Sequence, residues 1–336
     1  MPRVGRLHIA GGLYHVMGRG LERRWIFEED ADKEWFLNRF GECLNKAKAQ
    51  CFAWSLMSNH YHFLIRVGSD PLSCVMSSLL GSYGTYYNRR YSRVGYVFQN
   101  RFKSILCDEN QYLLALVKYI HLNPLKSRML PDLEALATYR WTGHAGMLGH
   151  KKRNWHQVDP VLSLFSHNRT RALYLYQLFM QEVDDGMQEQ NLSGGGLIRS
   201  YGGWEEVSKL RKRNIQCIGD ERILGSDEFV QRVIAQDELK LTKEAHFNRK
   251  DWDMKKLAER VCELTGLDFT ELSGKARNNK LSKAKALICY LAKEVLGYSL
   301  TQIADFLNIS QPAVSKWVKK GKQLDTHEKM ADEILG

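Results

Sequence analysis

Two histidines flank one bulky residue in the segment 58–65, which reads Ser-Asn-His-Tyr-His-Phe-Leu-Ile. If this segment is a strand, residues i and i+2 point to the same face. His60 and His62 then lie side by side, while Tyr61 points to the opposite face. Two imidazoles at this spacing can share a divalent metal ion. The alternative for so short a pattern is a strand that merely carries two polar residues.

A tyrosine and an asparagine stand four residues apart in the segment 118–124, which reads Lys-Tyr-Ile-His-Leu-Asn-Pro. On a helix, Tyr119 and Asn123 occupy positions i and i+4 and share one face. The amide oxygen of Asn123 could join the metal of the two histidines, with the phenol of Tyr119 one turn away. Tyrosine can form covalent intermediates as a nucleophile, and a metal ion on a phosphate neutralises charge and orients it for in-line attack. Taken alone, the pair is more typical of a core aromatic residue and a helix end before proline.

Both segments are part of a longer series of blocks in the first 145 residues. The blocks are Tyr14-His15-Val16 with Arg19-Gly20, Leu56 to His62, Tyr86 to Arg90, Gly95 to Phe98, Gln99 to Lys103, and Tyr112-Leu113 with Tyr119 to Pro124. Their order and spacing resemble the single-tyrosine transposases of the HUH endonuclease superfamily, and within these the branch associated with bacterial repetitive extragenic palindromes (REP). After Pro124 the family commonly continues with a valine and a small residue, whereas this chain has Leu125 to Met129.

The resemblance implies a role for each residue of the two motifs. His60, His62 and Asn123 would be metal ligands, Tyr119 the nucleophile, and the metal Mg²⁺ or Mn²⁺ rather than zinc. A carboxamide oxygen agrees with this choice, because it is a hard ligand. In the implied reaction Tyr119 attacks single-stranded DNA next to a hairpin, which produces a 5′-phosphotyrosine and a free 3′-OH, and a later attack by a 3′-OH joins strands. Tyr61 is a rival nucleophile, but strand alternation points it away from the histidines.

The periodicity around these motifs predicts the elements that must position them. The expected strands are 7–17, 51–57, 60–67 and 96–107, and the expected helices are 30–50, 72–91 and 109–122, the last stopped by Asn123-Pro124. The order β-α-β-β-α-β-α is that of the ferredoxin-like split βαβ arrangement with one added helix. We therefore expect an α+β protein whose nuclease domain, residues 1–145, has an antiparallel sheet with helices.

A mostly helical region is expected to follow this domain. It would consist of a connecting region (146–245) and a helical DNA-binding domain (246–336). The pattern predicts a loop or linker over 141–158, which begins just before the connecting region. Inside the connecting region it predicts helices over 159–183, 204–213 and 226–239, and a flexible glycine-rich stretch over 191–204. The connecting region could serve as a spacer, a DNA clamp or an autoinhibitory segment.

Residues 299–320 have the pattern of a helix-turn-helix. Ala304 is the small residue where two helices cross, and Asn308 suits the turn between them. Ser310 can cap the second helix, with Pro312 in its first turn. The alternative is an ordinary helical hairpin. Roughly the last 75 residues resemble the DNA-binding domain of the bacterial replication initiator, which implies binding to duplex DNA or to a hairpin stem.

Basic and polar residues near both motifs are candidates for contacts with DNA, although about half of such basic residues are usually only solvated. In the nuclease domain these are Arg89, Arg90, Arg101 and Lys103. In the C-terminal domain they are Lys275, Arg277 and Lys280 of a basic run, and Gln311, Ser315, Lys316 and Lys319 of the second helix.

The composition is consistent with a nucleic-acid partner. The 336 residues include 49 Lys or Arg and 38 Asp or Glu, a net charge of +11, which favours a polyanion. No apolar run approaches the ~20 residues that span a bilayer, and the N-terminus lacks an apolar signal core. Seven cysteines without a CxxC pair indicate reduced thiols rather than zinc ligands or disulfides. We therefore expect a cytoplasmic, nucleoid-associated protein that does not bind membranes.

Three functions fit these features. The first is a metal-dependent single-stranded DNA endonuclease and strand transferase that acts on palindromic repeats. The second is a helix-turn-helix transcriptional regulator with an inactive nuclease-like domain, which the intact set of His60, His62, Tyr119 and Asn123 disfavours. The third is a replication-initiating or plasmid-relaxing nuclease, for which a single tyrosine and this order of blocks are less typical. Both a monomer and a homodimer are compatible with the sequence.

Overall fold

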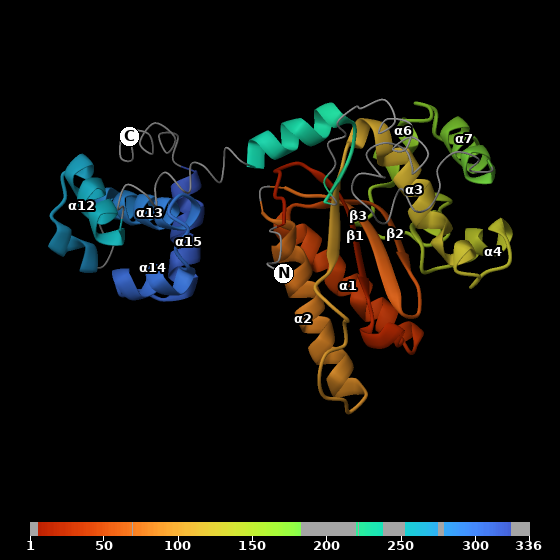
Figure 1. The fold of residues 1–336 in the computed structure, drawn as a ribbon, viewed down its shortest axis with the longest axis horizontal. Coiled ribbons are helices and arrows are strands. Elements are labelled where there is room, and N and C mark those ends of the chain that lie inside the picture. Colours follow the sequence, from red (N-terminus) through yellow and green to blue (C-terminus); the bar gives the residue numbers. More distant parts are fainter. Residues whose placement is uncertain are drawn as a thin grey trace, which may run out of the picture. The chain divides into compact units, whose positions relative to one another are not determined.

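The computed structural model describes residues 6–68, 70–182, 220, 222–237, 253–274 and 279–323. The chain divides into two compact units, Met1–Ile234 and Ala235–Gly336. Each unit has its own hydrophobic core and is described by itself (Figure 1). Within the described residues, no helix is both long and apolar enough to cross a bilayer.

The first unit is built on a five-stranded sheet. Its strands are β1 (Leu13–Arg19), β2 (Gln50–Leu56), β3 (His60–Arg66), β4 (Lys103–Cys107) and β5 (Ile223–Leu224). The strand order is β2-β3-β1-β4-β5, with β1 to β4 antiparallel to their neighbours and β5 parallel to β4. Because β3 lies between β1 and β2, the sheet has the split βαβ arrangement, and the α+β fold class is confirmed.

Helices cover both faces of this sheet (Figure 1). One face packs against α1 (Asp30–Ala47) and α2 (Leu72–Arg90) through side chains such as Phe36, Phe63 and Tyr83. The other packs against α3 (Glu109–Lys126) through Leu13, Leu64 and Ile120. Strand residues alternate between these two cores, as a period of two requires. The alternation places His60 and His62 on the α3 face and Tyr61 in the α1–α2 core.

Helix α3 continues past the point where the sequence pattern places its end. It runs through Pro124 to Lys126, whereas we expected Asn123-Pro124 to stop it. A proline this close to the C-terminus removes only one backbone hydrogen bond, and the next turn still closes, because the Ser127 N–H donates to the Asn123 carbonyl at 2.9 Å. Asn123 therefore lies inside the helix, one turn after Tyr119 on the same face.

Further helices lie beyond α3 in the first unit. They are α4 (Leu133–Thr138), α5 (Gly143–Met147), α6 (Val158–Ser163), α7 (Arg169–Gln181) and the part of a helix over residues 227–237 that precedes Ala235. The last of these confirms a predicted helix. The expected single helix 159–183 is wrong, because the segment forms two helices that are interrupted before Asn168. The side chain of Asn168 accepts a hydrogen bond from the Arg171 N–H at 3.0 Å and caps the start of α7. The expected loop 141–158 contains α5, and the predicted segments 191–204 and 204–213 lie outside the described residues.

Two of the expected strands differ from the observed ones at their ends. The first begins at Leu13 rather than at residue 7 and extends to Arg19. The segment 96–102 is a loop and not part of β4, to which only residues 103–107 contribute. A single bridge between Gly20 and Phe98 ties this loop to the end of β1. The loop therefore lies beside the sheet and does not extend β4.

A buried polar cluster connects α3 to its neighbouring elements. The Tyr176 hydroxyl of α7 lies 2.9 Å from His121 Nδ1 on α3 and 2.7 Å from His144 Nδ1 on α5. His156 is also buried and lies 3.2 Å, through Nε2, from the Phe52 carbonyl of β2. A side chain at Gly143 would clash with His121, so this glycine is required for the close approach. The cluster joins the helix that carries Tyr119 to α5, α7 and the sheet.

The second unit is a helical domain. Its elements are α12 (Met254–Thr265), the 3-10 helix η2 (Phe269–Ser273), α13 (Asn279–Glu294), α14 (Leu300–Leu307) and α15 (Gln311–Lys322). Helices α14 and α15 form the predicted helix-turn-helix, with Asn308 in the left-handed conformation of the turn (φ 51°) and Ala304 buried. Ser299 caps α14, whereas the side chain of Ser310 makes no capping hydrogen bond to α15.

Candidate active site

The two histidines of the first motif lie next to each other on β3. A tight turn precedes them, in which the Met57 N–H donates to the His60 carbonyl at 2.9 Å. His60 and His62 are opposite Arg19 and Met17 of β1, and their ring centroids are 5.4 Å apart with the rings nearly perpendicular. His62 is 6% exposed and His60 is half-buried. The register of the β1–β3 pair thus holds both imidazoles on one face of the sheet.

Helix α3 places Tyr119 and Asn123 over these histidines. The ring of Tyr119 meets the ring of His62 edge-on at 5.9 Å between centroids. Asn123 Nδ2 donates to the Tyr119 carbonyl at 2.9 Å, so the amide oxygen Oδ1 is turned away from that bond. Both side chains are less than 10% exposed. The structure therefore brings all four predicted site residues together.

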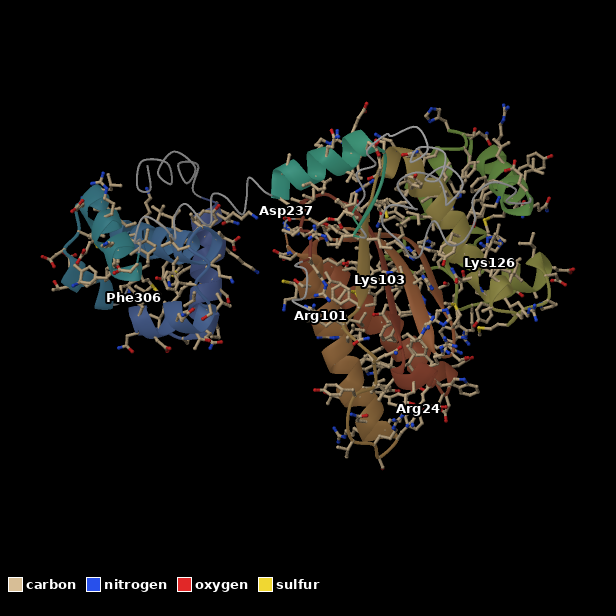
Figure 2. The ribbon with its side chains drawn as sticks, viewed as in Figure 1. Arg24, Arg101, Lys103, Lys126, Asp237 and Phe306 are labelled. Atoms are coloured by element: carbon tan, nitrogen blue, oxygen red, sulfur yellow. The ribbon has the colours of Figure 1, made fainter. Side chains whose placement is uncertain are left out.

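These four residues line one pocket of about 500 Å³. The remaining lining residues are Met17, Gly18, Arg19, Tyr61, Gln99, Asn100, Arg101 and Lys103. Three of them are cations, and within the described part of the chain no acidic side chain lines the pocket. Such a pocket attracts an anion. Arg101 and Lys103, both predicted as DNA contacts and both labelled in Figure 2, thus line the same pocket as the histidines and the tyrosine.

Burial keeps both imidazoles neutral. It lowers the pKa of His60 to about 4, to which the positive charge of Arg19 contributes. Burial also lowers the pKa of His62 well below its usual range, with His15, His60 and Arg19 acting in the same direction. A neutral imidazole has the lone pair that a metal ligand needs. By contrast, burial raises the pKa of Tyr61, which lies in the α1–α2 core and is unsuited to serve as the nucleophile.

A histidine that the sequence motif left without a role completes the site. His15 lies in the middle of β1, is fully buried, and places Nε2 2.9 Å from Nδ1 of His62. Its ring also meets the Tyr119 ring edge-on at 5.7 Å between centroids. His15 therefore touches both a predicted ligand and the predicted nucleophile. Strand alternation could have put it on the α3 face, but only the β1–β3 register brings it to His62.

The other histidine also has a partner at Nδ1. His60 Nδ1 lies 2.6 Å from Oδ1 of Asn59. The amide of Asn59 is oriented by a second hydrogen bond, since its Nδ2 donates to the Arg23 carbonyl at 3.1 Å. An amide oxygen can only accept, so His60 carries its proton on Nδ1 and has its lone pair on Nε2. Partners of this kind fix the tautomer and orientation of ligating histidines.

A lysine lies over the predicted nucleophile. Lys126 stands seven residues after Tyr119 at the end of α3, and its ammonium is 5.0 Å from the centre of the Tyr119 ring. Figure 2 shows Lys126 on this helix. A cation therefore lies over the ring of the predicted nucleophile.

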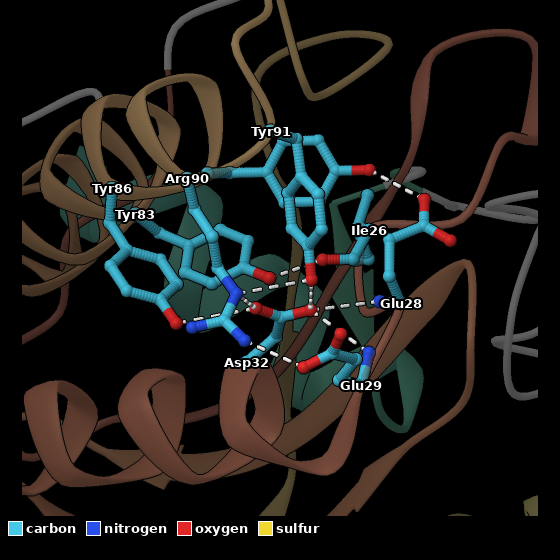
Figure 3. Close-up of polar contacts among 9 residues, drawn as sticks. Ile26, Glu28, Glu29, Asp32, Tyr83, Tyr86, Arg90 and Tyr91 are labelled. Carbon is cyan, nitrogen blue, oxygen red and sulfur yellow. Dashed lines mark hydrogen bonds and ion pairs between the residues drawn. The ribbon is translucent and has the colours of Figure 1, made fainter.

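The structure places the two arginines of α2 elsewhere. Arg90 makes ion pairs with Glu29 at 2.6 Å and with the fully buried Asp32 at 3.4 Å. Asp32 also accepts from the Glu28 and Glu29 N–H groups and from the Tyr91 hydroxyl (Figure 3). Arg90 is therefore part of the structure that starts α1. Arg89 is exposed and lines another hollow, beside Trp35 and Tyr86.

The predicted DNA contacts of the second unit lie on its surface. Gln311, Lys316 and Lys319 of α15 are exposed, Ser315 is half-buried, and Lys280 is exposed on α13. Gln311 Nε2 donates to the Thr301 hydroxyl at 2.9 Å, which joins the starts of α14 and α15. Lys275 and Arg277 lie outside the described residues. Helix α15 therefore presents one face with the predicted polar and basic residues.

Comparisons with known proteins match the two parts of the chain separately. Residues 9–123 match the family model described as "Transposase IS200 like", and residues 254–320 match "Bacterial dnaA protein helix-turn-helix". The chromosomal replication initiator protein DnaA of Pseudothermotoga lettingae is 27% identical over 120 residues, which are 36% of this chain and 26% of that protein. The chain thus spans about a quarter of the length of this relative.

A solved structure is similar to part of the chain. It is that of a REP-associated tyrosine transposase bound to a REP hairpin, with a TM-score of 0.37 and 15% identity, and the similarity covers 47% of this chain and 90% of that one. With the two family matches, the N-terminal part of the chain is transposase-like and the C-terminal part contains a DnaA-like helix-turn-helix.

Proposed function

We propose that this protein is a metal-dependent single-stranded DNA endonuclease and strand transferase that cuts beside a hairpin through a 5′-phosphotyrosine. One observation carries the proposal: the Tyr119 ring faces His62 inside a pocket that also holds His60 and Asn123 and is lined by cations. The match of residues 9–123 to the IS200-like transposases supports it.

The donor set of the pocket fits a small divalent cation. With Nδ1 of His60 and of His62 engaged by Asn59 and His15, each imidazole has Nε2 left as a ligand atom. Asn123 adds an amide oxygen. The described residues contain no group of three His, Cys, Asp or Glu side chains that could hold a metal ion. The two imidazoles and the amide would hold Mg²⁺ or Mn²⁺, a choice that the hard amide oxygen supports.

The bound cation would polarise the scissile phosphate and orient it for in-line attack. Arg101 and Lys103 neutralise the phosphate charge from the wall of the pocket. The Tyr119 oxygen attacks phosphorus and forms the phosphotyrosine bond as the bond to the 3′ oxygen breaks. The proton of the phenol is lost and the departing 3′ oxygen gains one, so the step is balanced. The reverse attack by a 3′-OH releases Tyr119 and joins strands.

The second unit supplies a different kind of contact. A helix-turn-helix recognises paired DNA by placing its second helix in the major groove. Here that helix is α15, with Gln311, Lys316 and Lys319 exposed. We propose that α15 binds a duplex or the stem of the hairpin, while the first unit cuts the adjacent single strand. The resemblance of residues 254–320 to the DnaA helix-turn-helix supports this division.

A covalent-adduct assay tests the proposed activity. Purified protein is incubated with end-labelled hairpin oligonucleotides that carry single-stranded flanks, with Mg²⁺, with Mn²⁺ or with EDTA, and the products are separated on a denaturing gel. We expect a protein–DNA adduct that requires the metal. A footprint on duplex DNA without an adduct on any hairpin would instead support a helix-turn-helix regulator with an inactive nuclease-like domain.

A further inference from the structure

A second hollow adjoins the active site. It has a volume of about 890 Å³ and lies between α2 and the loop 95–102. We call it the α2 groove; its walls include Ser77, Gly81, Gly84 and Thr85 of α2, Tyr96 to Phe102 of the loop, and Arg6. Gln99, Asn100 and Arg101 line both this groove and the pocket of Tyr119. The pocket of Tyr119 and the groove therefore share part of their lining.

Small residues keep the groove open on the helix side. Ser77, Gly81 and Gly84 follow one another at intervals of four and three residues and so lie on one face of α2. A Cβ atom at Gly81 or at Gly84 would meet nothing within 4 Å. No close packing therefore demands a glycine at either position. Glycine is the least favourable residue after proline inside a helix, so two of them on this face indicate that the space itself is useful.

The other walls suit a nucleic-acid strand. The Arg6 guanidinium lies 3.8 Å above the Phe102 ring and donates to the Phe102 carbonyl at 3.2 Å. Tyr96 is 85% exposed and Phe98 is half-buried, so both can offer ring surface to a base. Stacking on aromatic rings along a basic groove is how proteins hold single strands without sequence preference.

Charge identifies the kind of occupant. Arg6 and Arg101 lie near enough that Arg101, after burial, is a main cause of the lowered pKa of Arg6. Within the described residues neither arginine pairs with a carboxylate, and none of the groove's lining residues is acidic. Two neighbouring cations that have no counter-ion among the described residues favour an anion between them. A chain of phosphates supplies such anions at regular intervals.

We propose that the α2 groove binds the single-stranded DNA that continues from the scissile phosphate, with phosphates at Arg6 and Arg101 and bases against Tyr96 and Phe98. The proposal rests on the proposed function, because the groove shares part of its lining with that active site. The groove would thus be a DNA-binding surface of the first unit in addition to the pocket of Tyr119, and distinct from α15 of the second unit. It also gives the loop 95–102, which does not join β4, the task of connecting pocket and groove.

A substitution that fills the groove tests this directly. Gly84→Leu places a side chain in the open space, whereas Gly84→Ala makes the same change of backbone propensity and leaves most of the space free. Both are made together with Tyr119→Phe, Lys316→Ala and Lys319→Ala, so that cleavage and binding by α15 do not contribute. Binding of fluorescein-labelled (dT)16 is measured by fluorescence anisotropy at constant salt.

We expect Gly84→Leu to weaken (dT)16 binding about 10-fold relative to Gly84→Ala, as loss of one or two stacked bases would. In ultraviolet cross-linking, 4-thiothymidine in (dT)16 should attach to the peptide that contains residues 95–102. Equal affinities of the two variants, or cross-links confined to other peptides, would overturn the proposal and assign the groove to another class of partner. Circular dichroism melts check that both variants are folded.

The adduct assay separates this proposal from the proposed function. With Tyr119 restored, Gly84→Leu should still form the adduct on a hairpin whose flank ends one nucleotide beyond the cut, and should lose efficiency only on longer flanks. If the wild type forms no adduct but Gly84→Leu still weakens (dT)16 binding, the enzymatic proposal fails and the groove stands. If the adduct forms and flank length has the same effect in both variants, the groove proposal fails alone.

Discussion

His15 Nε2 lies 2.9 Å from His62 Nδ1, between two neighbouring strands of the sheet, and both rings are buried. If His62 holds a metal through Nε2, its proton must be on Nδ1, and His15 must accept that proton through Nε2. His15 is then a positioning residue: it fixes the tautomer of a ligand without touching the metal. Asn59 does the same for His60 from the turn before β3.

A pair of substitutions tests the role of His15. His15→Phe fills the space without an acceptor, and we expect it to weaken Mn²⁺ binding about 10- to 100-fold, the usual effect of losing such a partner. His15→Gln can still accept through its amide oxygen and should retain most of the affinity. Electron paramagnetic resonance titration of Mn²⁺ measures this without DNA. Equal affinities for the two variants, both folded by circular dichroism, would show that His15 only packs.

Arg101 and Arg90 should behave differently although both are exposed arginines of the first unit. Arg101 lines the active-site pocket, so Arg101→Gln should reduce adduct formation about 10-fold through loss of a phosphate contact. Arg90 is paired with Glu29 and the buried Asp32, so Arg90→Gln should lower the melting temperature and leave the adduct rate of the folded protein nearly unchanged. The same substitution at both sites makes each the control for the other. The prediction fails if Arg90→Gln slows the reaction as much as Arg101→Gln.

The different environments of these arginines show what the sequence could and could not predict. The spacing of His60 and His62 and that of Tyr119 and Asn123 depend only on local periodicity, which the strand and the helix preserve. Arg90 seemed equivalent to Arg89 in the sequence, because its partners Glu29 and Asp32 are about sixty residues away along the chain. Contacts of that range depend on how α1 and α2 pack, which no local pattern contains.

The same limit applies to the remaining differences. His15 belongs to a recognisable block, but its contact with His62 depends on the strand register, and a shift of one residue would point it to the other core. Helix α3 continues through Pro124 because the packing of α3 and one further hydrogen-bonded turn outweigh the tendency of proline to end a helix. The segment 96–102 was expected to continue the strand 96–107, but among the described residues only the bridge from Phe98 to Gly20 pairs it with the sheet.

The buried histidines behind α3 should make stability depend on pH. Burial lowers the pKa of His156 to about 4 and, together with His150, that of His144 to about 4, from 6.5 in an exposed histidine. Between these values the unfolded chain binds more protons than the folded one, so the free energy of unfolding falls as the pH falls from 6.5 toward 4. The upper bound is about 3 kcal/mol for each histidine.

Chemical denaturation at several pH values measures this dependence. His156→Gln keeps a donor for the Phe52 carbonyl but cannot titrate, so it should reduce the slope between pH 6.5 and 4, to which His144 still contributes. His167→Gln, the same substitution at an exposed position, serves as the control for the change of side chain itself. A wild-type stability that is constant over this range would contradict the prediction.

The lysines of α15 should control binding to duplex DNA through phosphate contacts. Each of Lys316→Ala and Lys319→Ala should weaken binding at low salt and reduce the slope of log K against log salt concentration by about 1. Lys255→Ala on α12 is the matched control, since Lys255 is exposed but lies in a different helix, 3.9 Å from Glu259. Fluorescence anisotropy with a labelled duplex at several salt concentrations gives both quantities. Unchanged slopes in the α15 variants would place the DNA on another face of the unit.

Peptide mapping of the covalent product tests the central claim most directly. After reaction with a hairpin oligonucleotide and Mg²⁺, the adduct is digested with trypsin and nuclease, and tandem mass spectrometry locates the tyrosine that carries the nucleotide phosphate. We expect a single modified tyrosine, Tyr119, and complete loss of the adduct in Tyr119→Phe while Mn²⁺ binding is retained. A phosphate on Tyr61 or on any other tyrosine, or an adduct that persists in Tyr119→Phe, would contradict it.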